Sequence, residues 1–241
     1  MSALICGSFA FDTIMVFQDY FKNHILPDKV HILNVAFHVP DMRREFGGCA
    51  PNIAYNLKLL RGNPLPMGTV GKDFSPYAEW MDQHGIPRNH VKKIECSYTA
   101  QAFITTDQDD NQITAFHPGA MDYAHEVKVG DAQGVKIGIV SPDGRQGMID
   151  HAQQFAEAGI PFIFDPGQAM PLFTADDFKL FIEQASWVCV NDYESQLLQD
   201  RTGWSPHEIA ERVTALIVTR GGEGSYIYMS GKRIEIPAAK A

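Results

Sequence analysis

Residues 137–164 read IGIVSPDGRQGMIDHAQQFAEAGIPFIF and contain two short apolar runs separated by a helical stretch. The runs at 137–140 and 161–164 lack polar alternation, which is typical of parallel strands buried on both faces. Residues 147–158 between them are predicted to form a helix. A strand, a helix and a strand in this order predict one crossover unit of a parallel sheet.

The same alternation continues on both sides of this unit. Further apolar runs that end in turn or polar residues, as buried strands do, lie at 3–6, 187–190 and 216–219. Further helices are expected at 51–60, 74–84, 178–185 and 193–201. The repeated order predicts an α/β fold whose sheet is doubly wound and mostly parallel.

Two regions, about 13–46 and 100–117, break this rhythm because apolar and polar residues alternate along them. Alternation predicts strands with one solvated face, and Asp109-Asp110-Asn111 marks a hairpin turn in the second region. We expect these strands to form a small β-sheet lid over one end of the main sheet. An exposed face on such a lid would suit a homodimer.

Composition excludes several classes of protein. The 241 residues are 45% hydrophobic, enough for a sizeable core, and the net charge of -9 disfavours nucleic acids and anionic membranes as partners. The four cysteines are widely spaced, which gives little support for a disulfide framework or a zinc site. No apolar run approaches the roughly 18 residues of a membrane span. We expect a cytoplasmic protein that binds a small molecule.

Polar residues in the first half suggest a ligand site under the lid. Gly47-Gly48 lies between a lid strand and the helix opened by Pro51, so it is a candidate hinge or a plain turn. Asn52, in the first helical turn, suits a hydroxylated ligand or an N-terminal cap. Asp12 follows the first strand at the carboxyl edge, where it would accept hydrogen bonds from two hydroxyls or lie in a solvated turn.

Two aromatic residues of the lid hairpin are candidates for stacking. Phe103 and Phe116 lie on the two arms, on either side of the turn. If both point into the cleft, they can flank a planar base. The alternative is packing within the lid.

The second half carries two motifs suited to a nucleotide. Asn191 and Glu194 lie on one face of the helix that begins there, where they suit hydrated Mg²⁺ and phosphates, or form a capping box. The loop 219–224 has glycines that permit close backbone approach to a nucleotide. It is not a Walker A loop, because the Gly-Lys-Ser/Thr ending is absent, and the turn after the first strand lacks G-x-G-x-x-G.

Taken together, three motifs resemble the ribokinase-like (PfkB) family of sugar and nucleoside kinases: Gly47-Gly48-Cys49-Ala50-Pro51-Asn52, Asn191-x-x-Glu194 and Thr219-x-Gly221-x-x-Gly224. Residues 116–121 and 202–205 are more specifically similar to the bacterial adenosine kinase branch. The resemblance implies a three-layer α/β/α sandwich with a lid. It also implies ATP- and Mg²⁺-dependent phosphoryl transfer to a nucleoside, adenosine above others.

The resemblance also implies roles for individual residues. The substrate-binding set would be Ser8, Asp12, Gly47, Gly48, Asn52, Phe103, Phe116 and Gln168, with the two phenylalanines around the purine. The nucleotide-binding set would be Asn191, Thr219, Gly221 and Gly224. Glu194 would order Mg²⁺ through water.

One part of the family pattern is not found. Members carry a Gly-Ala/Cys-Gly-Asp turn whose Asp is the general base, and nothing of that kind follows Gly224. We therefore expect no catalytic base in this chain but an Asp beyond Ala241, with residues 1–241 forming a single ribokinase-like domain that is incomplete at its C-terminus. The alternatives are a kinase of the same family acting on ribose, fructose or a related sugar, and a non-catalytic nucleoside-binding relative.

Overall fold

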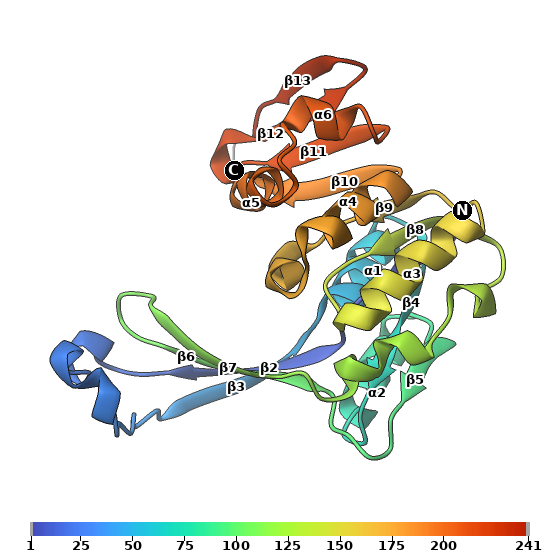
Figure 1. Cartoon of the computed structure of the whole chain (residues 1–241). Helices are drawn as coiled ribbons and strands as arrows, with labels where there is room; N and C mark the ends of the chain where they lie inside the picture. Colours follow the sequence, from blue (N-terminus) through green and yellow to red (C-terminus); the bar gives the residue numbers. More distant parts are fainter. Residues whose placement is uncertain (1, 240–241) are drawn as a thin grey trace.

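The computed structural model describes residues 2–239, and its main sheet has the predicted doubly wound form (Figure 1). Seven strands run parallel: β1 (Ser2–Cys6), β4 (Asn63–Val70), β5 (His90–Lys93), β8 (Val135–Val140), β9 (Phe162–Phe164), β10 (Trp187–Asn191) and β11 (Ala215–Thr219). Two antiparallel strands follow: β12 (Ser225–Met229) and β13 (Lys232–Ile236). The spatial order is β13-β12-β11-β10-β9-β8-β1-β4-β5.

Strand β1 marks the point at which the strand order reverses. β4 lies on one side of it and β8 on the other. The loops that leave β1 and β8 are joined, because Ser8 N donates to Pro142 O at 2.9 Å and Ser141 N donates to Cys6 O at 2.9 Å. Open α/β sheets bind ligands at the carboxyl ends of strands around such a point.

Helices cover both faces of the sheet, as predicted. They are α1 (Cys49–Leu59), α2 (Ser75–Gln83), α3 (Arg145–Glu157), α4 (Ala175–Gln184), α5 (Asp192–Thr202) and α6 (Pro206–Ala210). Leu4 of β1 packs in a core with residues of α3, α4, α5 and α6, whereas Ile5 packs with α1 and α2. Successive strand residues point to opposite faces, so one strand anchors both layers. No helix within residues 2–239 is long and apolar enough to cross a membrane.

The sequence reasoning missed β4 and β5. Pro64 and Pro66 lie inside β4, and proline usually argues against a central strand because it lacks an N–H group. The structure accommodates both, because β5 pairs only with Met67–Val70. The proline-containing half of β4 therefore has no partner strand on the side of β5, and the missing N–H groups of the prolines break no hydrogen bond there.

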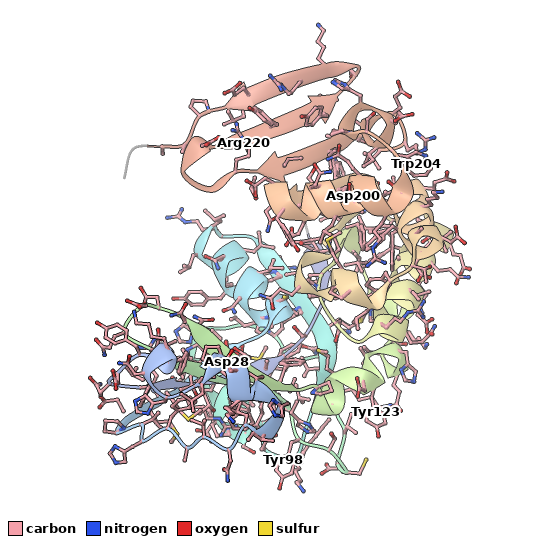
Figure 2. All side chains as sticks on the ribbon, turned by 60° about the vertical axis from the view of Figure 1, so that its left-hand side comes forward. Asp28, Tyr98, Tyr123, Asp200, Trp204 and Arg220 are labelled. Atoms are coloured by element: carbon pink, nitrogen blue, oxygen red, sulfur yellow. The ribbon has the colours of Figure 1, made fainter. Side chains whose placement is uncertain are left out.

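The lid is a separate four-stranded sheet that extends from the main sheet as an arm (Figure 1). Its order is β3 (Asp41–Gly47), β2 (Ala10–Val16), β6 (Ala100–Thr106) and β7 (Gln112–His117). Figure 2 shows Asp28 on the lid and Arg220 near the C-terminal strands, in separate parts of the molecule.

The strand interpretation of region 13–46 is wrong over residues 17–40. This segment contains the short 3-10 helices η1 (Phe21–Asn23) and η2 (Pro27–Ile32). Phe37 packs against Phe17 and Phe21, with ring centroids 4.8 and 5.0 Å away. Local aromatic packing outweighs the alternating pattern here.

Candidate active site

The double glycine brings the start of α1 against the loop after β1. Gly48 has φ 91°, and a Cβ there would lie 2.7 Å from both Ala10 N and Phe9 Cα. Ser8 accepts two backbone hydrogen bonds at this junction: its carbonyl from Ala50 N and its Oγ from Cys49 N, both at 3.2 Å. Only glycine fits position 48, because a side chain would meet backbone atoms at positive φ.

Asp12 lies at the root of the lid, over Gly47. A Cβ on Gly47 would be 2.7 Å from the carboxyl carbon of Asp12, so the glycine makes room for the carboxylate. The carboxyl group is half-buried, and burial, with a smaller contribution from Glu45 on β3, raises its pKa. A partly desolvated acceptor at the junction of the lid and α1 is suited to bind ligand hydroxyls.

Asn52 is exposed in the first turn of α1, as predicted. Its Nδ2 donates to the carbonyl of Gly48 at 2.9 Å. Hydrogen bonding within the turn therefore orients the amide at the same junction as Ser8 and the two glycines.

The two lid phenylalanines do not point into one cleft. Phe116 pairs with Ala102 across β6 and β7, whereas Phe103 pairs with Ala115. Neighbouring residues on a strand point to opposite faces, so Phe103 and Phe116 lie on opposite faces of the lid. Phe116 shares its face with Asp12, which also pairs with Ala102. The expectation that both rings flank a base is therefore corrected: Phe116 alone lies on the Asp12 face.

A buried acid that the sequence reasoning did not select, Asp143, lies near this junction. Asp143 follows β8 and is 2% exposed; Oδ1 accepts from Gly144 N at 2.9 Å, and Oδ2 has no hydrogen-bond partner within residues 2–239. Burial raises the pKa of Asp143 to about 8. Burial raises the pKa of the Cys49 thiol to about 11, an effect reduced by Ser8 and increased by Asp165, Asp143 and Asp12. The signal that could have identified Asp143 is an Asp next to a proline within three residues of the end of a strand.

Asn191 and Glu194 form the capping box that was the alternative interpretation. Asn191 Oδ1 accepts from Glu194 N, and Glu194 Oε2 accepts from Asn191 N, both at 2.8 Å. The Glu194 carboxylate also acts on Asp165, whose pKa is raised to about 6, mainly by burial and then by Glu194. Carboxylates that influence one another suit a hydrated Mg²⁺ that also contacts phosphates. Within residues 2–239, no group of three or more His, Cys, Asp or Glu is arranged to hold a metal.

Thr219 and the glycine loop adjoin this capping box. Thr219 pairs directly with Asn191 at the carboxyl ends of β11 and β10. Gly221 has φ 52°, and no atom lies within 4 Å of its Cβ position, so a ligand can approach its backbone. Gly224 has φ 94°, and a Cβ there would be 2.7 Å from Ala238 N, so both the backbone conformation and the packing require this glycine.

Gln168 is exposed in η5 (Gly167–Leu172), directly after the turn that follows β9. Its neighbour Gly167 has φ 43°, and a Cβ there would be 2.7 Å from Pro142 Cγ. The turn that carries Gln168 is thus packed on the β8 loop that carries Asp143.

The sequence profile of the pfkB family carbohydrate kinases matches residues 13–241. The chain belongs to this family. Among relatives of this pfkB-family chain, a nucleoside kinase of Methanocaldococcus jannaschii is 31% identical over 210 residues, which cover 86% of the chain and 69% of the relative.

Solved structures agree with the pfkB assignment. Burkholderia thailandensis nucleoside kinase in complex with inosine has a TM-score of 0.89 and 51% identity, covering 99% of this chain and 77% of that one. The same kinase in complex with ADP-inosine has a TM-score of 0.85 and 54% identity, covering 99% and 75%. These similarities establish a ribokinase-like fold and indicate that the pfkB chain is a kinase.

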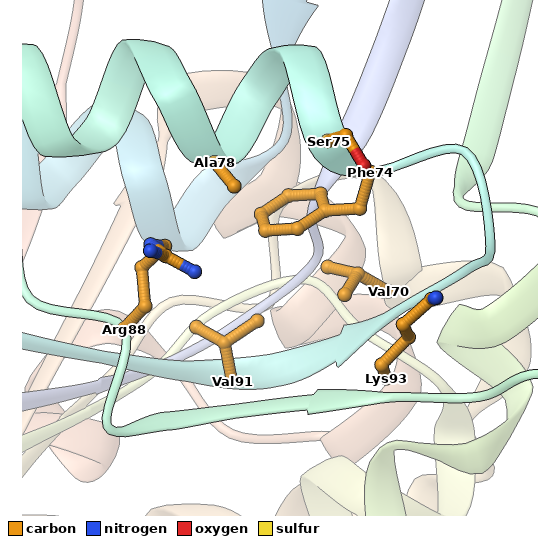
Figure 3. A pocket seen from close by; sticks show the side chains of 7 residues that line it. All are labelled: Val70, Phe74, Ser75, Ala78, Arg88, Val91 and Lys93. Carbon is orange, nitrogen blue, oxygen red and sulfur yellow. The ribbon is translucent and has the colours of Figure 1, made fainter.

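A cavity of about 190 Å³ in this pfkB kinase lies away from the site, between α2 and the edge formed by β4 and β5 (Figure 3). Four apolar side chains, the Ser75 side chain and two cations, Arg88 and Lys93, line it. The cations already have partners, because Arg88 donates to Asp82 at 2.8 and 2.7 Å and Lys93 lies 3.1 Å from Glu95. No predicted site residue lines this cavity.

Proposed function

We propose that the protein transfers the γ-phosphoryl group of ATP to the 5′-hydroxyl of a purine nucleoside. One observation carries this proposal: the hydroxyl-binding candidate Asp12 follows β1, and the paired Asn191 and Thr219 end β10 and β11 at the same carboxyl edge. Phosphoryl transfer depends mainly on holding acceptor and donor together and on neutralising charge. The nucleoside kinases among the relatives support the same reading.

The acceptor would bind at the root of the lid. The Asp12 carboxylate would accept hydrogen bonds from the ribose hydroxyls, with Ser8, Gly47, Gly48 and Asn52 lining the junction. Gln168 would approach from the turn after β9. Closure of the lid would exclude water, which otherwise competes with the nucleoside as phosphoryl acceptor.

The donor would bind along β10 and β11. Thr219, Asn191 and the open backbone at Gly221 would contact ATP, and Gly224 would hold the loop in shape. Glu194 would hold hydrated Mg²⁺ through water; Mg²⁺ supplies charge neutralisation for the phosphates when bound.

Adenosine is the acceptor predicted from the sequence, and inosine is the one named for a related kinase. Both are purine ribonucleosides, so Asp12 can serve both in the same way. We propose adenosine and inosine as substrates and a cytoplasmic location for the reaction.

The test is ADP formation by the full-length protein with adenosine, inosine, ribose or fructose as acceptor. We expect turnover with the two nucleosides and little with the sugars. Turnover of ribose without either nucleoside would favour the sugar-kinase alternative. Nucleoside binding by calorimetry without ADP formation would favour the non-catalytic alternative.

A further inference from the structure

Tyr77 on α2 is hydrogen-bonded to the double glycine of the candidate acceptor site. Its hydroxyl donates to the carbonyl oxygen of Gly47 at 2.8 Å, and its side chain is fully buried. Burial, with a smaller contribution from Asp12, raises the pKa of this hydroxyl, so it remains a donor at neutral pH. A buried donor on α2 therefore holds one peptide group at the junction of the lid and α1.

The ring of Tyr77 also packs on the two strands that lead from this junction into the lid. Its centroid lies 5.7 Å from that of Phe11 on β2 and 4.6 Å from that of Phe46 on β3. The ring of Phe74, directly before α2, lies 5.3 Å away. Close packing of this kind keeps the ring in one position. The direction of the hydroxyl is fixed as a result.

The peptide group between Gly47 and Gly48 is restrained little by its own residues. Gly47 is the last residue of β3, and Gly48 has φ 91°. Because neither residue has a Cβ, the peptide group between them can rotate at little steric cost. The hydrogen bond from Tyr77 opposes this rotation.

Holding the Gly47 carbonyl also sets the direction of the Gly48 N–H group. No peptide bond within residues 2–239 is cis, so the C=O and N–H of this peptide point in opposite directions. The carbonyl points to Tyr77, and the N–H therefore points away from it. The backbone hydrogen bonds of residues 2–239 leave this N–H without an acceptor. It is an available donor beside Asp12, whose carboxylate lies over Gly47.

We propose that Tyr77 is a positioning residue for the acceptor, whose hydroxyl sets the Gly47–Gly48 peptide so that the Gly48 N–H and the Asp12 carboxylate bind the nucleoside together. The inference rests on the proposed function and deepens it. A hydroxyl group both donates and accepts hydrogen bonds, so a donor beside a carboxylate satisfies a diol more fully than the carboxylate alone. Tyr77 acts through Gly47, because its own hydroxyl is buried and already bonded.

The experiment measures the dissociation constants of inosine and ATP for the full-length protein and its Tyr77→Phe variant by calorimetry. Phenylalanine keeps the packed ring and removes only the hydroxyl. We expect about tenfold weaker inosine affinity, as for the loss of one well-placed hydrogen bond, and ATP affinity within about twofold. The KM for inosine should rise by a similar factor, whereas kcat changes by less than about threefold.

Two control variants separate positioning from stability. Tyr55→Phe removes a hydroxyl from the same aromatic group, because the Tyr55 ring packs on Trp80 at 5.4 Å and Trp80 packs on Tyr77 at 5.7 Å. Phe74→Leu loosens the packing around Tyr77 but keeps its hydroxyl. Both controls should leave inosine affinity within about twofold, although Phe74→Leu lowers the Tm. Thermal unfolding confirms that each variant is folded.

Hydrogen exchange of the Gly48 amide, followed by NMR, tests the donor in the unsubstituted protein. We expect rapid exchange without ligand and protection by inosine, because the N–H then gains an acceptor. Slow exchange without ligand, or no protection by inosine, overturns the inference.

Unchanged inosine affinity in folded Tyr77→Phe also overturns the inference, as do equal losses for inosine and ATP. These outcomes leave the proposed function intact as long as the unsubstituted protein phosphorylates inosine or adenosine. If it binds neither nucleoside, the proposed function itself fails, and the inference fails with it.

Discussion

The carboxylate of Asp73 accepts a hydrogen bond from the backbone N–H of Thr99 at 2.8 Å. This bond ties the loop after β4 to the start of β6, the strand that enters the lid. The second carboxylate oxygen of Asp73 accepts from Gln101 at 3.2 Å and from Arg44 at 3.4 Å, two residues on the lid face opposite Asp12. Asp73 therefore fixes the root of the lid on the face opposite Asp12.

Asp73→Ala is expected to destabilise the fold. It removes the acceptor of one backbone and two side-chain donors, and hydrogen bonds to a charged group contribute about 1.5–3 kcal/mol. The expected fall in Tm is about 3–12 °C, measured by calorimetry. Asp122→Ala is the control, because Asp122 is exposed. Equal Tm values for the two variants would show that the Asp73 contacts contribute nothing.

Asp12→Ala is expected to weaken nucleoside binding about 10- to 100-fold, because a charge-assisted hydrogen bond to a hydroxyl is lost. Isothermal titration with inosine and with ATP measures the two ligands separately, and ATP affinity should not change. Glu45→Ala is the control, since Glu45 pairs with Asp12 but belongs to β3 and is exposed. Full retention of inosine affinity in Asp12→Ala would place the acceptor elsewhere.

Gly47→Ala is expected to displace the Asp12 carboxylate, because the new Cβ would overlap it. We expect at least a tenfold loss of nucleoside affinity by calorimetry. Gly222→Ala is the matched control, since no atom lies within 4 Å of its Cβ position. A Gly47→Ala variant with unaltered nucleoside affinity would contradict the described packing of Asp12.

Asp143→Asn is expected to change how stability depends on pH. The pKa of Asp143 is about 8 in the folded protein, above its value of about 4 in an unfolded chain. The folded state therefore binds the proton more tightly, and this contribution to stability, complete below about pH 4, is lost as pH rises through 8. The Tm of the asparagine variant relative to the unsubstituted protein should rise between pH 5 and 8 and level off above. Parallel Tm curves would rule out a shifted pKa.

The lid face opposite Asp12 is expected to pair two copies of the chain. Phe103, Met42 and Ile113 lie on that face and are 41, 69 and 44% exposed. Exposed apolar side chains in a group are typical of interaction surfaces. Light scattering should give a dimer for the full-length protein and a monomer for Phe103→Glu. A monomer in both cases would contradict the prediction.

Prediction from sequence was most successful where packing follows from a local pattern. The unit at 137–164 became β8, α3 and β9, because buried parallel strands and amphipathic helices differ in period. The faces of Phe103 and Phe116 were not predictable, since a shift of one residue in strand pairing reverses every side chain. The role of Asn191 and Glu194 was open for a similar reason, because the same spacing suits a helix cap and a ligand site; the structure shows the cap. Asp143 was missed because its burial depends on how two loops meet.

The junction of the β1 and β8 loops has a consequence for biosynthesis. Ser141 Oγ donates to Cys6 O across 135 positions of the chain, so β1 leaves the ribosome well before β8 and waits for it before both of its edges are paired. During that interval the nascent chain exposes a strand made of apolar residues, which favours aggregation and binding by chaperones. Slowed translation before residue 135 should therefore lower the yield of native protein more than slowed translation after residue 165.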